Sequence, residues 1–195
     1  MSETQEREIL NAASTLFQKY GIRKTTMEDI AGGASMGKSS LYYYFKSKEA
    51  VYEAVLREQF VEFKYLIKSG LEGYESSQEL ITAFIKLVYS RIFDFPALID
   101  ALLHSEEGKA SIISRAVSTE FEQWQLDMIE KLLRHGVDRQ EFREMEESEL
   151  VINSQAIGIA MFGVRSILIN EKDKSAFENK IDSLIYLLLH GIGKV

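Results

Sequence analysis

One short stretch of the chain, Gly32 to Ser39, carries residue types whose spacing could support catalysis, and it reads G-G-A-S-M-G-K-S. The string satisfies the phosphate-binding loop pattern G-x-x-x-x-G-K-[ST], in which backbone N–H groups surround the phosphates of a nucleotide. In such a loop Lys38 would reach the phosphates and the hydroxyl of Ser39 would contact Mg²⁺. A small nucleotide-binding phosphotransferase is therefore one function to be weighed.

The residues that precede this string do not fit a phosphate-binding loop. Such a loop follows a buried β-strand, which should be a nearly continuous apolar run. Two adjacent carboxylates, Glu28 and Asp29, stand there instead, and the spacings Thr25-x-x-Glu28 and Thr26-x-x-Asp29 resemble capping boxes at a helix start. The apolar residues have the i, i+3, i+4 spacing of a helix: Met27, Ile30 and Ala31. The sequence therefore predicts a helix, not a strand, before the glycines.

Composition favours an all-α protein that needs no cofactor. The chain has 195 residues, 46% of them hydrophobic, which is enough for a sizeable core in one or two domains. It has a single proline, Pro96, and its apolar periodicity is helical almost throughout. The absence of cysteine excludes disulfides and cysteine-ligated metals. The histidines are far apart in sequence, without metal-ligand spacing: His104, His135 and His190.

Charge and hydropathy place the protein in the cytoplasm and give it a basic segment. The N-terminus is polar and acidic, and the longest apolar run, Ala156 to Val164, is much shorter than the about 20 residues that span a bilayer. Net charge is −7, yet residues 19–48 hold six basic and two acidic side chains, a local charge of +4. A basic segment on an acidic body is typical of a DNA-reading module attached to another domain.

The apolar pattern predicts nine helices. Their expected ranges are about 4–20, 26–33, 38–44, 47–70, 78–93, 96–103, 111–134, 148–170 and 175–191. Gly21 and Gly136 are expected to end the first and the seventh helix, and the stretch 137–147 is expected to be a polar loop. Ser47 is expected to cap the fourth helix, and Ser76-x-x-Glu79 is a capping box that opens the fifth.

The first three expected helices fit a helix-turn-helix domain. The second helix of the motif must be short and exposed on one side. In the helix at 38–44 and just after it, Leu41 and Phe45 have the i, i+4 spacing of an inward face. The other side chains supply hydrogen-bonding groups and aromatic rings: Lys38, Ser39, Ser40, Tyr42, Tyr43 and Tyr44. We expect this helix to contact DNA, where phosphate contacts position a protein and base contacts specify the sequence.

The stretch Ile30 to Glu49, I-A-G-G-A-S-M-G-K-S-S-L-Y-Y-Y-F-K-S-K-E, strongly resembles the TetR family of transcriptional regulators. Members of that family typically read I-A-x-x-A-G-V-S-x-G-x-L-Y-x-Y/H-F-x-S/N-K-E there. The upstream pairs Tyr20-Gly21 and Thr25-Thr26 also match. The resemblance implies a DNA-binding domain at 1–48 and an effector-binding and dimerisation domain of about six helices at 49–195.

The resemblance also implies roles for single residues. Thr26 matches a phosphate contact at a helix N-terminus, a position that the helix dipole favours. Lys38 and Ser40 match positions that read bases or adjacent phosphates. Tyr42 and Tyr44 match positions that clamp the DNA backbone, with core packing as the alternative for Tyr42. Lys48 matches a phosphate contact in the first turn of the fourth helix.

The turn of the motif departs from the family pattern. Ser35 stands where the family's turn glycine usually lies, and a serine in the left-handed conformation costs on the order of 1 kcal/mol. Gly37 replaces a serine cap, and Gly32 and Gly33 occupy helical positions at roughly 1 kcal/mol each relative to alanine. We therefore expect a loosely held turn that becomes ordered on DNA.

The last two expected helices have the composition of a dimer interface. The ninth is apolar on most sides, which requires burial on most sides: Phe177, Ile181, Leu184, Ile185, Leu187, Leu188, Leu189 and Ile192. The eighth carries small residues that allow close helix approach: Ala156, Gly158, Ala160 and Gly163. Two such helices from each subunit would make a four-helix bundle across a two-fold axis; burial within a monomer is the alternative.

By the resemblance, the central helices enclose an effector pocket. Its candidate lining residues, each of which could instead be plain core, are Phe84, Val88, Arg91, Ile92, Leu102, Leu103, Phe121, Trp124, Met128, Gln155 and Ile159. Their aliphatic and aromatic character suggests an apolar or aromatic effector. The sequence thus favours a dimeric repressor that binds a pseudo-palindromic operator and is released by a small molecule. The phosphotransferase and a purely protein-binding helical adaptor remain the alternatives.

Overall fold

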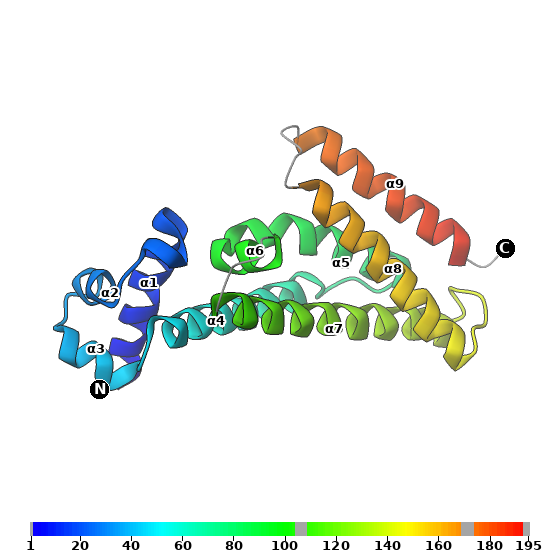
Figure 1. Cartoon of the computed structure of the whole chain (residues 1–195). Coiled ribbons are helices and arrows are strands. Elements are labelled where there is room, and N and C mark those ends of the chain that lie inside the picture. Colours follow the sequence, from blue (N-terminus) through cyan, green and yellow to red (C-terminus); the bar gives the residue numbers. More distant parts are fainter. Residues whose placement is uncertain (1, 104–108, 169–173, 193–195) are drawn as a thin grey trace. The chain divides into compact units, whose positions relative to one another are not determined.

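The computed structural model describes residues 2–103, 109–168 and 174–192, and every regular element within them is a helix (Figure 1). The all-α prediction is confirmed. In chain order the elements are α1 (Ser2–Lys24), α2 (Met27–Gly33), α3 (Lys38–Tyr44), α4 (Lys48–Gly70), α5 (Ser77–Arg91), a 3-10 turn (Ile92–Asp94), α6 (Pro96–Leu103), α7 (Lys109–Asp138), α8 (Glu147–Leu168) and α9 (Lys174–Ile192).

The helix starts follow the local capping signals. Thr26 caps α2 and forms a capping box with Asp29, the second of the two spacings that the sequence offered. Ser76 forms the corresponding box with Glu79 at the start of α5. The Ser47 hydroxyl accepts a hydrogen bond of 3.1 Å from the backbone N–H of Ala50, as expected for the cap of α4.

Of the two glycines expected to end helices, Gly21 interrupts the helical backbone of α1 with a φ of 76°. The end predicted at Gly136 is wrong. α7 continues past Gly136 to Asp138, because Gly136 serves packing and not termination. A Cβ atom there would lie 2.1 Å from Cδ2 of Phe142, so only glycine allows this ring to approach the helix. Phe142 and Met145 are buried, although they belong to the stretch predicted as a polar loop. The helix ends instead at a turn in which Gln140 has a φ of 60°.

The chain forms two compact units. One comprises residues 1–63 and 94–119, and the other comprises residues 64–93 and 120–195, so that α4 and α7 contribute to both. Each unit has fully buried large side chains of its own: Ile9, Ile30, Leu41, Leu56 and Leu98 in the first, and Phe84, Phe121, Ile129 and Phe142 in the second. The predicted domain boundary after residue 48 stays a prediction. None of the helices in the described ranges is long and apolar enough to cross a membrane.

Candidate nucleic-acid interface and ligand pocket

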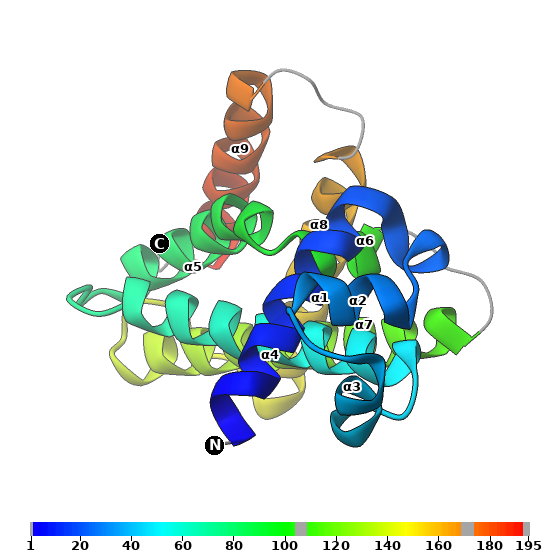
Figure 2. The ribbon, with the colours of Figure 1, turned by 90° about the vertical axis from the view of Figure 1, so that its left-hand side faces the viewer.

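The first three helices pack as a small three-helix unit, in which α2 contacts both α1 and α3 (Figure 2). Ile9 and Ala13 of α1, Ile30 of α2 and Leu41 of α3 are fully buried, and Phe45 closes the C-terminal end of α3. The predicted inward face of α3 is therefore confirmed. Because Leu41 is the one buried residue of α3, most of this short helix is exposed.

The opposite face of α3 presents polar and aromatic side chains to solvent. Ser39 and Ser40 are exposed, and so are Tyr42 and Tyr43, the latter with 79% of its surface accessible. Tyr42 is therefore not a core residue. Tyr44 is half-buried; its ring lies edge-on to that of Tyr43 at 5.3 Å, and its hydroxyl donates to Oε1 of Gln5 at 2.5 Å. This face offers both hydrogen-bonding groups and flat rings.

Two further predicted contact residues stand at helix N-termini. Thr26 is exposed, and its backbone N–H and hydroxyl donate to Oδ2 of Asp29 at 2.8 and 2.7 Å. Lys48 is the first residue of α4, and its ammonium group donates to the carbonyl oxygen of Arg23 at 3.3 Å. Both residues stand at helix N-termini, where the helix dipole favours an anion, and their contact with phosphate stays a prediction.

The ammonium group of Lys38 forms an ion pair with Glu28 of α2. The hydrogen bond between them raises the pKa of Lys38 and lowers that of Glu28. Both side chains are more than half exposed, so the pair is open to exchange with an incoming anion. The Lys38 ammonium also lies 5.9 Å from the centre of the Tyr42 ring.

The turn between α2 and α3 rules out a phosphate-binding loop. The N–H groups of Ala34, Ser35 and Met36 donate to the carbonyl oxygens of Ile30, Gly32 and Ala31, so they are not directed at a nucleotide. The element before the glycines is α2, where the loop requires a strand. The phosphotransferase alternative is therefore wrong. The hydrogen bonds from Ser35 and Met36 form a Schellman motif, with Ser35 at φ 54° in the position that glycine usually occupies.

A pocket of about 350 Å³ lies between α7 and α8. Its volume is at the lower end of the range of about 300–1,000 Å³ that small-molecule sites have. Two of the predicted effector residues, Gln155 and Ile159, line it. The remaining lining residues are Glu122, Gln125, Leu126, Gly158, Phe162 and Arg165.

The other predicted pocket residues are elsewhere. Most are buried or half-buried: Phe84, Val88, Ile92 and Phe121 are buried, and Leu102, Leu103, Trp124 and Met128 are half-buried. The Trp124 ring centre lies 5.8 Å from that of Phe84 and 5.7 Å from that of Phe121, so these three aromatic rings pack on one another. Arg91 is exposed. A role for these residues in binding an effector stays a prediction.

With this geometry in view, comparison with known proteins identifies the chain. The sequence profile described as "Bacterial regulatory proteins, tetR family" matches residues 9–55, which include α2, α3 and the start of α4. The fold matches the crystal structure of a transcriptional regulator from Cytophaga hutchinsonii, with a TM-score of 0.74, 26% identity, and coverage of 95% of this chain and 97% of that one. The chain belongs to the TetR family of transcriptional regulators.

Two other proteins are similar to the chain over different extents. The HTH-type transcriptional repressor KstR2 of Rhodococcus jostii is 27% identical over 133 residues, which are 66% of this chain and 65% of that protein. The match therefore spans just under two thirds of the length of that relative. FadR from Bacillus subtilis, solved in complex with stearoyl-CoA, shares the fold at a TM-score of 0.72 and 19% identity, covering 95% of this chain and 98% of that one.

The pocket residues of this TetR regulator that sequence reasoning missed follow a simple pattern. One face of α8 carries four pocket residues at helical spacing: Gln155, Ile159, Phe162 and Arg165. The prediction stopped at Ile159, although the same face continues for two further turns. On α7, Gln125 and Leu126 lie between Trp124 and Met128, which were selected because they extend the apolar stripe of that helix. The signal that sequence reasoning missed on α7 is a polar residue, Gln125, within an otherwise apolar face.

Large apolar side chains of α8 and α9 are exposed. They are Val151, Ile152, Ile159 and Phe162 on α8, and Tyr186 and Leu187 on α9, with Ile159 reaching 72% exposure. The two helices contact each other. Of the small residues expected to bring helices of two subunits together, Gly158 instead faces α7, where an added Cβ would lie 2.5 Å from Cδ2 of Leu126. Phe177 and Ile192 lie outside the residues whose side chains are described.

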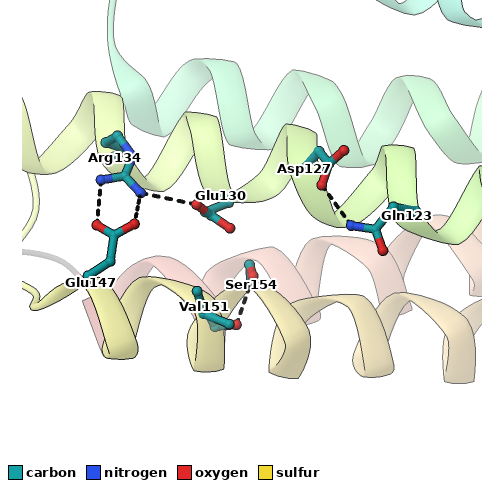
Figure 3. A network of polar contacts seen from close by, with 7 residues as sticks. All are labelled: Gln123, Asp127, Glu130, Arg134, Glu147, Val151 and Ser154. Carbon is teal, nitrogen blue, oxygen red and sulfur yellow. Dashed lines mark hydrogen bonds and ion pairs between the residues drawn. The ribbon is translucent and has the colours of Figure 1, made fainter.

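A polar network joins α7 to the N-terminus of α8 (Figure 3). The guanidinium of Arg134 donates to both carboxylate oxygens of Glu147 at 2.7 and 2.6 Å and to Glu130 at 3.0 Å. The hydrogen bond from Arg134 lowers the pKa of Glu147. Such bidentate contacts fix orientation as well as distance. The two helices that line the pocket are thereby held together at one end.

Proposed function

We propose that this TetR-family regulator binds a pseudo-palindromic DNA operator as a homodimer, represses transcription, and is released by a small apolar or aromatic effector. The observation that carries the DNA-binding part is α3, a short helix with one buried residue and an exposed face of hydroxyls and aromatic rings. Such a face can follow base edges in the major groove.

On this proposal the contacts fall into two classes. Lys38, Ser39 and Ser40, in the first turn of α3, read base edges or the phosphates beside them. Tyr42, Tyr43 and Tyr44 contact the DNA backbone with their hydroxyls. Phosphate contacts come from Thr26 and Lys48 at helix N-termini, and they set the position of α3 without reading sequence.

Homodimerisation is supported by the exposed apolar residues of α8 and α9 that do not line the pocket, Val151, Ile152, Tyr186 and Leu187, because exposed apolar surface marks interaction sites. A two-fold dimer presents two copies of α3 to DNA. The half-sites of the operator would then lie one helical turn apart, about 34–36 Å.

Effector release is supported by the pocket between α7 and α8. In a two-state mechanism, the effector binds more tightly to the form whose recognition helices no longer match the operator, and it shifts the population toward that form. That FadR of the same fold was solved with stearoyl-CoA is consistent with a small-molecule site, and the name of KstR2 as a repressor favours repression over activation.

The proposal is tested by selecting bound fragments from the whole genome of the source organism with the full-length protein. We expect a palindromic site to be enriched. For that site, the slope of log affinity against log salt should fall by about one in Lys48→Ala, because one phosphate contact is lost. Lys131→Ala, in an exposed lysine of α7 with no proposed DNA contact, is the matched control and should keep the slope.

The absence of any enriched DNA site would reject the proposal and favour the helical adaptor. An enriched site whose salt slope is equal in the wild type and in Lys48→Ala would keep the DNA-binding function. It would remove Lys48 from the contact set.

A further inference from the structure

The pocket between α7 and α8 contains a buried positive charge. The side chain of Arg165 is 10% exposed, and its guanidinium lies over two rings, 5.7 Å from the centre of Phe121 and 5.0 Å from that of Phe162. Among the described residues, the carboxylate of Glu122 accepts a long hydrogen bond from Arg165, 3.3 Å from Nη2 to Oε1. A guanidinium has five N–H donors, so most of its hydrogen-bonding capacity is not used by Glu122.

The counter-ion of Arg165 is easily displaced. The side chain of Glu122 is 51% exposed, so its carboxylate can turn into solvent without losing hydration. Arg165 cannot do the same, because it is enclosed by the two phenylalanine rings and the wall of the pocket. A buried cation requires a partner anion, and a carboxylate from outside could offer two oxygens in the geometry that a guanidinium prefers.

A second buried polar side chain lines the same pocket. Gln125 is buried, and its amide nitrogen donates to the thioether sulfur of Met161 at 3.1 Å, a weak acceptor. Behind it, the Tyr89 hydroxyl donates to the Met161 carbonyl oxygen at 2.5 Å. The pocket therefore combines a polar base formed by Arg165 and Gln125 with apolar walls formed by Leu126, Ile159 and Phe162.

We propose that the effector is an acidic amphiphile, whose carboxylate binds Arg165 in place of Glu122 and whose apolar body lies along Leu126, Ile159 and Phe162. The assignment rests on the effector role proposed above and specifies its chemistry. Binding exchanges one carboxylate for another at the same guanidinium, so that no charge remains buried without a partner. The apolar body covers side chains that are now exposed at the mouth of the pocket.

The test compares two ligands that differ only in the head group, decanoate and decanol, by calorimetric titration of the full-length protein. Wild-type protein should bind decanoate at least about tenfold more tightly than decanol, the ratio expected from a charge-assisted hydrogen bond. Arg165→Met should remove this preference by weakening decanoate alone. Glu122→Gln should strengthen decanoate binding, because the competing carboxylate is gone, and should leave decanol unchanged.

The Glu122 variant separates ligand binding from folding, because a half-exposed residue can be replaced without disturbing the core. Weaker or unchanged decanoate binding in Glu122→Gln would overturn the proposal, as would equal affinity of the wild type for the two ligands, or binding of neither. Release of operator DNA by decanol as efficiently as by decanoate would keep this pocket as the effector site and reject the carboxylate. Loss of specific DNA binding in the absence of ligand would instead count against the proposed function.

Discussion

Replacing Ser35 by glycine should stabilise the turn of the helix-turn-helix. Ser35 has a φ of 54° at the C′ position of the Schellman motif that ends α2. For an L-residue the left-handed conformation is unfavourable, whereas glycine adopts it without steric conflict. The side chain of Ser35 is exposed, and no hydrogen bond from its hydroxyl supports the conformation in the described structure.

The size of the effect follows from two opposing terms. Removing the Cβ relieves a conformational free energy of about 1–2 kcal/mol. Glycine also increases the entropy of the unfolded chain, which offsets about 0.4–1 kcal/mol of that gain. The net stabilisation of the turn should therefore be about 0.5–1 kcal/mol.

Native-state hydrogen exchange measures this locally. The amides of residues 30–40 should exchange about two- to fivefold more slowly in Ser35→Gly than in the wild type, in protein free of DNA. If the turn becomes ordered on DNA, as the sequence predicts, the additional protection conferred by operator DNA should be smaller in this variant.

Gln140→Gly provides the matched control. Gln140 has a φ of 60° and ends α7 in a turn with the same hydrogen-bond pattern, from Gln140 to Val137 and from Glu141 to Gly136. It should slow exchange around its own turn and leave residues 30–40 unchanged. Unchanged exchange in Ser35→Gly would refute the reasoning that the left-handed serine loosens this motif, and equal exchange with and without operator would refute ordering on DNA.

Three further substitutions test the second compact unit and a helix of the first. Glu147→Gln removes a carboxylate whose pKa is held below its ordinary value of 4.5 by the hydrogen bond from Arg134. The Arg134–Glu147 contact stabilises the fold fully above pH 4.5, and this stabilisation is lost as the pH falls through the lowered pKa. The urea midpoint of the variant should therefore lie below that of the wild type at neutral pH and approach it in acid, whereas a constant difference would exclude this linkage. Gly136→Ala should destabilise by about 1–3 kcal/mol in urea unfolding, because the new methyl meets the buried ring of Phe142. Gly32→Ala should instead stabilise α2 by up to about 1 kcal/mol, because an added Cβ at Gly32 would have no atom within 4 Å. Similar effects of the two glycine-to-alanine substitutions would contradict the packing argument.

Most helices could be predicted because their determinants are local. Thr26 with Asp29 and Ser76 with Glu79 each satisfy backbone groups within one turn, and Pro96 starts α6 where its missing N–H has no consequence. The exposed face of α3 was also predictable, since a seven-residue helix with a single inward leucine must show its other residues to solvent.

The pocket was not predictable by the same means. Sequence reasoning selected aromatic and aliphatic residues on helix faces, and the structure uses several of them, such as Phe84 and Phe121, to pack against one another. The cavity depends on how α7 and α8 pack, with Gly158 allowing the side chain of Leu126 to approach closely. Helical spacing shows which residues of α8 share a face, but it does not show which part of α7 that face contacts.

On the proposed contact set, the ion pair between Glu28 and Lys38 makes DNA binding by Lys38 an exchange reaction. In the free protein the lysine of α3 already has an anionic partner within its own chain. A phosphate or base that takes over Lys38 must displace that carboxylate, so the gain from each contact is the difference between two similar interactions. Sequences that offer Lys38 a poor acceptor leave the internal pair intact and gain nothing from this residue. An internal competitor of this kind therefore lowers the affinity most for sites that engage Lys38, and this lysine adds affinity only where the DNA offers a better acceptor than Glu28.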